Sequence, residues 1–102
     1  MQEFKSHVDL LILGVLHRAP AHGYGLVETI RERSERVFDL AEGTVYPALY
    51  RLERQGLVES EWESGHARKR RVYRLTKKGA SQLQVDRDGW RRQVQAMQAV
   101  LG

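Results

Sequence analysis

Residues 6–18 carry apolar side chains on almost every face of a predicted helix. The segment 6–18 reads SHVDLLILGVLHR, and Pro20 follows shortly after it. Because proline cannot continue a helix, we predict that the helix ends before Pro20. One small domain cannot cover all sides of such a helix. We therefore expect this helix to pack on two sides, one of them against a partner.

Two shorter amphipathic helices are predicted next. Apolar residues recur at helical spacing over residues 25–35, which follow a tight turn that contains two glycines. A third helix is predicted to begin near Thr44 as its cap, because Pro47 fits best in a first turn, and to stop at Gly56. The inward residues of these two helices are Leu26, Val27, Ile30, Val45, Ala48, Leu49 and Leu52.

Two extended runs, residues 57–64 and 69–76, predict a β-hairpin. In the first run, glutamates alternate with other side chains, as in a strand that has one face in water. The alternating residues are Glu59, Ser60, Glu61, Trp62, Glu63 and Ser64. This hairpin follows the third helix directly.

Residues 76–101 show the pattern of one long helix, interrupted only by Gly89. Apolar residues seven positions apart form a seam typical of a coiled coil, with Arg87 as its polar member. The two rows are Leu83, Trp90 and Met97, and Ala80, Arg87, Val94 and Leu101.

The order helix, helix, turn, helix, hairpin, helix is that of a winged helix-turn-helix protein. We therefore predict a mainly α fold with a small β-hairpin. Residues 1–76 are expected to form the DNA-binding domain. Residues 77–102 are expected to form a C-terminal dimerisation helix packed on the same unit.

The chain has a net charge of +4, and the positive charge is concentrated near the hairpin. Seven Lys or Arg and no acid lie in residues 66–78. Because cysteine is absent and the four histidines lie on separate elements, we expect no metal site, and no group of residues resembles a catalytic site. We predict no enzyme activity and no cofactor. The N-terminus resembles no secretory signal, so we expect a cytoplasmic protein without a membrane span.

Candidate DNA contacts lie on three elements. Outward side chains of the third helix suit base edges and phosphates, although a solvated helix face would also explain them. The basic hairpin residues can neutralise phosphates, or can pair across strands with its glutamates. A tyrosine at the start of the second helix is placed either for a phosphate or for packing. The candidates are Thr44, Tyr46, Pro47, Tyr50, Arg51, Lys69, Arg70, Arg71 and Tyr24.

The surplus apolar faces of the first and last helices predict a homodimer interface. Trp90 has two interpretations: an anchor of this interface, or one wall of a pocket in which a flat aromatic effector stacks between subunits. The predicted interface residues are Leu10, Leu13, Leu83, Trp90, Val94, Met97 and Leu101.

Three sequence segments together resemble the PadR family of transcription regulators, in its branch with a short C-terminal region. GTVYPALYRLERQGLVE at 43–59 is similar to the family's recognition-helix signature, and LLILGVL with HGYG lies upstream. RRVYRLTKKG at 70–79 resembles the family's wing, except that Val72 stands where relatives often have an aromatic residue. The resemblance implies a dimer in which the last helix embraces the partner's first helix. It also implies repression at an operator, relieved by an effector.

We therefore expect a sequence-specific regulator, a homodimer on an inverted-repeat operator in double-stranded DNA. Replacing both Arg70 and Arg71 with alanine should weaken binding to all duplexes and lower its salt dependence. The main alternative is a winged-helix module that uses its basic face on an acidic protein partner. A third is a small-molecule sensor or an unrecognised enzyme that works through a pocket at Trp90.

Overall fold

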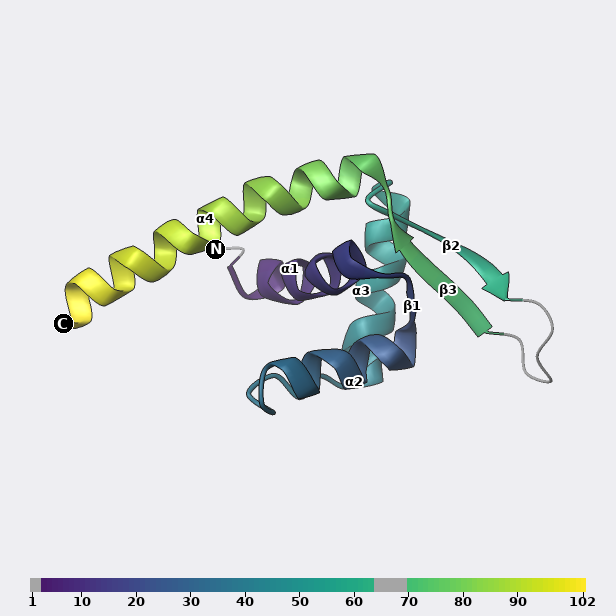
Figure 1. Cartoon of the computed structure of the whole chain (residues 1–102), viewed down its shortest axis with the longest axis horizontal. Coiled ribbons are helices and arrows are strands. Elements are labelled where there is room, and N and C mark those ends of the chain that lie inside the picture. The colour runs from purple at the N-terminus through teal and green to yellow at the C-terminus, as the bar shows by residue number, and fades with distance from the viewer. Residues whose placement is uncertain (1–2, 64–69) are drawn as a thin grey trace.

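The computed structural model describes residues 3–63 and 70–102 and confirms a mainly helical fold with a small sheet. Figure 1 shows α1, α2 and α3 gathered into one body, from which the hairpin projects at one end and the long last helix at the other. The elements are α1 (Glu3–Arg18), β1 (Ala21–His22), α2 (Gly23–Arg33), α3 (Glu42–Arg54), β2 (Val58–Glu63), β3 (Arg70–Leu75) and α4 (Lys77–Leu101).

The core lies where the first three helices meet the base of the hairpin and the start of α4. Each fully buried aliphatic side chain there contributes roughly 1.5–3 kcal/mol. Leu13 and Leu83 belong to this core, at 0% and 2% exposure within the single chain. Our prediction that Leu13 contacts a partner is therefore wrong, because its own chain already encloses it. Leu83 also lines an apolar groove on the surface, so its contact with a partner stays a prediction.

A third strand joins the hairpin that the sequence predicts. β1 pairs antiparallel with β3, Ala21 opposite Tyr73, which gives the strand order β1-β3-β2. Two residues between Pro20 and Gly23 are too few to show an alternating pattern, so sequence reasoning missed this strand. It fixes the end of α1 and the start of α2 to the hairpin.

The register of β2 and β3 divides the hairpin into two faces. Trp62 lies opposite Arg71 and Glu63 opposite Arg70, and side chains alternate along each strand. We call the face toward α3 the inner face; its residues are Val58, Ser60, Trp62, Arg71, Tyr73 and Leu75. The outer face consists of Glu59, Glu61, Glu63, Arg70, Val72 and Arg74.

Helix α3 begins earlier than predicted. Its cap is Ala41, whose carbonyl accepts hydrogen bonds from the amides of Thr44 and Val45, so Thr44 is not the cap. Pro47 therefore lies inside the helix. The helix tolerates it because the missing amide would have served the carbonyl of Gly43, which lies in the exposed first turn. Gly56, at φ +78°, ends the helix as predicted.

The base of the hairpin is fastened to the start of α4. The hydroxyl of Thr76 accepts from the amide of Gly79 at 3.0 Å and donates to the carbonyl of Gly56 at 2.7 Å. A Cβ at Gly79 would lie 2.0 Å from the carbonyl oxygen of Leu57, so only glycine permits this approach. From this point α4 runs 25 residues, about 37 Å at 1.5 Å per residue.

Candidate nucleic-acid interface

One side of α3 carries aromatic and basic side chains in water. Tyr46 and Tyr50 are 41% and 65% exposed, opposite the buried stripe of the helix. The guanidinium of Arg54 lies 5.7 Å from the centre of the Tyr50 ring. Thr44 and Pro47, also predicted here, are exposed on the same helix. Flat rings and cations at this spacing suit the methyl groups, base edges and phosphates of a DNA groove.

The first turn of α2 lies directly against this face. A Cβ at Gly23 would lie 2.4 Å from Cε1 of Tyr46, so the tyrosine ring rests on the bare backbone of α2. Tyr24 follows and is exposed. The close contact sets the spacing between the two helices and therefore the direction of the Tyr46 ring.

Arg51 departs from the prediction. Its guanidinium forms an ion pair with the carboxylate of Asp9 on α1, both side chains are mostly buried, and its Nε is buried without a partner. Arg51 therefore ties α3 to α1 and does not offer a free cation to DNA. Removing one partner of such a buried pair is destabilising, because the remaining charge loses its compensating partner of opposite sign.

The inner face of the hairpin meets α3 through a chain of hydrogen bonds. Nε of Arg71 donates to the Ser60 hydroxyl at 2.7 Å, and that hydroxyl donates to the Glu53 carboxylate at 2.7 Å. The Arg71 guanidinium also lies 4.9 Å from the ring centre of Trp62. Burial, and then the charge of Glu53, raise the pKa of the neighbouring Tyr73. Sequence reasoning placed Arg71 at the site but missed Glu53 and Ser60.

A cleft of about 530 Å³ lies between α3 and the inner face. Its walls are Tyr50, Glu53, Arg54, Arg71 and Tyr73. The cleft therefore joins the exposed side of the helix to the arginine of the hairpin. Because side chains alternate along a strand, the sequence could have placed Arg71 and Tyr73 on one face of the hairpin. It could not have shown that this face meets α3 without the register of the two strands.

The outer face is a ladder of ion pairs. Arg74 contacts Glu61 at 2.7 Å, and Arg70 contacts Glu63 at 3.0 Å. Nε2 of His22, on β1, lies 3.2 Å from the same Glu63 oxygen. The cross-strand pairing that we weighed from the sequence thus holds for Arg70 but not for Arg71. Lys69, the remaining predicted hairpin contact, lies outside the described residues.

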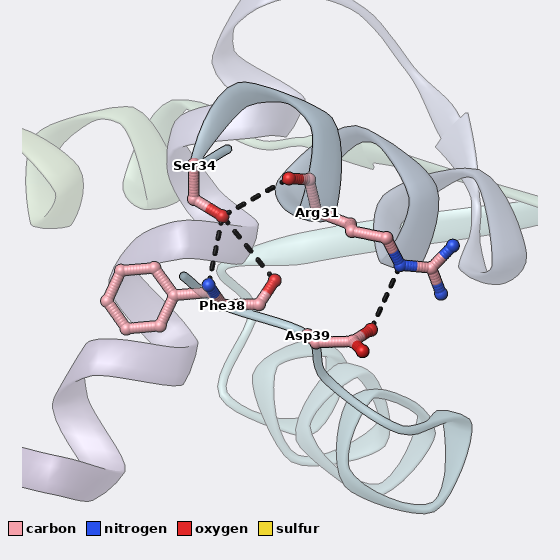
Figure 2. A network of polar contacts seen from close by, with 4 residues as sticks. All are labelled: Arg31, Ser34, Phe38 and Asp39. Atoms are coloured by element: carbon pink, nitrogen blue, oxygen red, sulfur yellow. Dashed lines mark hydrogen bonds and ion pairs between the residues drawn. The ribbon is translucent and has the colours of Figure 1, made fainter. Parts of the chain in front are cut away.

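An apolar groove of about 450 Å³ lies on the opposite side of the molecule, between α1, the end of α2 and α4. Leu10 and Trp90, both predicted interface residues, line it. Figure 2 shows how the loop after α2 places Phe38, another lining residue: the Ser34 hydroxyl accepts from the Phe38 amide at 3.0 Å, and Arg31 pairs with Asp39 at 2.9 Å.

Beyond this groove, α4 continues past the body of the molecule (Figure 1). Met97 and Leu101 are exposed there and Val94 is half-buried. Val100, which we did not single out, is 84% exposed. A helix that exposes this much apolar surface normally marks an interaction site.

No group of three or more side chains in residues 3–63 and 70–102 is arranged to hold a metal ion. None of the helices described has both the length and the hydropathy needed to cross a membrane.

Known proteins share both the sequence and the fold. The model of the PadR-like family of transcriptional regulators matches residues 12–85. The transcriptional regulator Rv3488 of Mycobacterium tuberculosis is 41% identical over 90 residues, 85% of this chain and 79% of that protein. A PadR family regulator from Clostridium difficile R20291 has a TM-score of 0.83 and 33% identity, over 94% of this chain and 99% of that one.

A PadR from Bacillus subtilis, solved in complex with operator DNA, shares the fold with a TM-score of 0.68 and 22% identity. The match covers 74% of this chain and 44% of that one. The match to the family model and the 41% identity to Rv3488 settle the class of the protein. The chain belongs to the PadR-like family, and it is a transcriptional regulator and not an enzyme.

Proposed function

We propose that the protein is a homodimeric repressor that binds an inverted-repeat operator in the cytoplasm. In this proposal residues 1–76 are the DNA-binding domain and residues 77–102 the dimerisation helix. Each copy places α3 in a major groove, and the two grooves lie about one helical turn apart. The observation that carries the proposal is the exposed tyrosine and arginine face of α3, which continues into Arg71 on the inner face of the hairpin.

The residues have distinct roles in this proposal. Tyr46, Pro47 and Tyr50 lie near bases, and Arg54 joins them because its guanidinium stacks beside Tyr50. Backbone phosphates are contacted by other side chains that are exposed or have donors available. The proposed phosphate contacts are Tyr24, Thr44, Lys69, Arg70 and Arg71, of which Arg70 contributes less because Glu63 already holds it.

The apolar surface of α1 and α4 supports the dimer. Leu10 lines the groove, and Trp90, Val94, Met97 and Leu101 follow along α4 to its far end. We propose that α4 of one copy covers the groove of the other. A small aromatic effector that stacks on Trp90 in this groove would change the spacing of the two α3 helices and release the operator.

The test begins with selection of bound sequences from a random duplex pool. Fluorescence anisotropy then compares the selected duplex with a scrambled one at two salt concentrations, and sedimentation measures the assembly. We expect a dimer, a clear preference for the selected duplex and twofold symmetry in it. A stable monomer, or equal binding of the two duplexes, would overturn the proposal and favour an acidic protein partner.

Two further comparisons sharpen the test. Arg54→Gln should weaken binding severalfold, whereas Arg36→Gln, which removes an exposed charge from the loop after α2, should leave it unchanged. For the effector, Trp62→Phe leaves Trp90 as the only tryptophan, so that quenching by planar aromatic compounds reports on the groove. An absence of quenching across such a set would leave Trp90 as an interface anchor.

A further inference from the structure

Arg71 differs from the other arginines described in the hairpin. Arg70 and Arg74 each form an ion pair with a glutamate of β2. Arg71 forms no ion pair with any described residue; its Nε is held by the Ser60 hydroxyl, which leaves both Nη nitrogens as available donors. The charge of such a guanidinium is not offset by a direct ion pair, and the group offers its two Nη nitrogens as donors in one plane.

Three side chains determine where that plane lies. Ser60 holds the Nε edge of Arg71 and is itself held by Glu53, each contact at 2.7 Å. Trp62 covers the guanidinium at 4.9 Å although 58% of the tryptophan is exposed. A largely exposed tryptophan gains little from burial, so its contact with the cation is its main local interaction. The guanidinium therefore rests in one orientation before any ligand arrives.

The chain of contacts also crosses between two elements. Glu53 belongs to the last turn of α3, whereas Ser60 and Arg71 belong to the hairpin. The same stretch of α3 carries Tyr50 and Arg54, which share the cleft with Arg71. The hydrogen bonds from Arg71 to Ser60 and from Ser60 to Glu53 therefore also fix the hairpin relative to the exposed side of α3.

We propose that Glu53 and Ser60 are positioning residues for DNA binding: they hold Arg71 in place so that the hairpin contacts the DNA backbone in fixed register with α3. The inference rests on the proposed function, since it assumes that Arg71 contacts a phosphate. Without these two hydrogen bonds, the Arg71 side chain becomes fixed in one conformation only when DNA binds, and this loss of conformational entropy lowers the affinity. The number of phosphates contacted does not change.

A positioning residue and a phosphate contact can therefore be told apart, because only the loss of a phosphate contact changes the salt slope. Affinity for a selected duplex is measured at several salt concentrations for the dimer of wild type, Ser60→Ala, Ser60→Thr and Arg71→Ala, and for Ser60→Ala combined with Arg71→Ala. Arg71→Ala should lower the affinity and reduce the salt slope by about 1.8, because each of the two subunits loses one phosphate contact worth about 0.9. Ser60→Ala should lower the affinity about three- to tenfold with an unchanged slope. Ser60→Thr, which keeps the hydroxyl and suits a strand, should restore the affinity.

The double variant decides whether Ser60 acts through Arg71. If it does, Ser60→Ala has no further effect once Arg71 is alanine. An equal loss in both backgrounds, or an Arg71→Ala protein that binds like wild type, would overturn the inference. Thermal unfolding of each variant separates these results from a loss of fold. If the wild-type protein itself prefers no duplex, the proposed function has failed, which is a different result.

Discussion

The two faces of the hairpin carry arginines one residue apart, and these arginines have different surroundings. On the outer face, glutamates of β2 neutralise Arg70 and Arg74. On the inner face, Arg71 lies over Trp62 and is hydrogen-bonded to Ser60, beside the exposed side of α3. A count of positive charges along the sequence treats these residues alike. The pleat of the strands separates them, and only one face brings its arginine to the cleft at α3.

The largest expected effect is the loss of DNA affinity when the arginine of the inner face is replaced. Arg71→Ala should lower affinity for the selected duplex roughly tenfold per subunit, and so about a hundredfold for the dimer, because each subunit loses a hydrogen bond to a charged group. Arg70→Ala is the matched control on the outer face and should cost much less, because its charge is already paired with Glu63. Anisotropy titrations measure both. Equal losses would mean that the two faces do not differ in DNA binding.

A second prediction concerns a substitution that removes the ion-pair partner of an arginine on the outer face. Glu61→Gln removes the carboxylate that holds Arg74, so Arg74 becomes free to attract phosphates. We expect affinity for every duplex to rise severalfold at low salt, with a salt slope steeper by up to about 1.8, because the dimer releases one cation in each subunit. Titrations of selected and scrambled duplexes check this. A gain confined to the selected duplex would contradict the charge argument.

A third prediction concerns stability. The pair of Arg74 and Glu61 is largely exposed, so Arg74→Ala should lower the free energy of unfolding by only about 0.2–1 kcal/mol. Urea denaturation followed by circular dichroism measures the change. A loss of several kcal/mol would show that the outer face supports the fold far more than its exposure indicates.

The smallest expected effect is at alkaline pH. Burial raises the pKa of Tyr73 above its ordinary value of 10.0, and the charge of Glu53 adds to this. The unfolded chain therefore loses this proton first as the pH rises above about 10, and the contribution to stability that is full below that pH is lost. Tyr73→Phe should lose less stability than wild type between pH 9 and 11 in parallel urea titrations. An identical pH dependence would mean that Tyr73 titrates equally in both states.

Much of the fold follows from patterns that the sequence shows directly. The end of α1, the inward residues of α2 and α3, the hairpin and the single long last helix are all present, because helical and strand periods identify the buried face. The predicted start of α3 at Thr44 is wrong, because the helix begins after Ala41 and its exposed first turn tolerates Pro47 inside the helix. The strand β1 was missed because two residues carry no period.

The site was harder to predict because it depends on how elements meet. Periodicity placed Arg51 on the outward side of α3, but a long side chain can reach sideways, and the partner on α1 lies far away in the sequence. Leu13 showed the same apolar pattern as Leu10 and Leu83, which line the groove, and only packing separates it from them. Ser60 and Glu53 gave no signal by type, since their role comes from the register of the hairpin.

The fastening between the hairpin and α4 has a mechanical consequence. Because Gly79 lies against the backbone of Leu57 and Thr76 bonds to Gly56, α4 cannot swing at its base without moving the hairpin. Over a length of about 37 Å, a rotation of one degree at that base displaces the far tip by about 0.6 Å. The long helix thus acts as a lever arm, and a shift at its tip turns the hairpin through the same small angle.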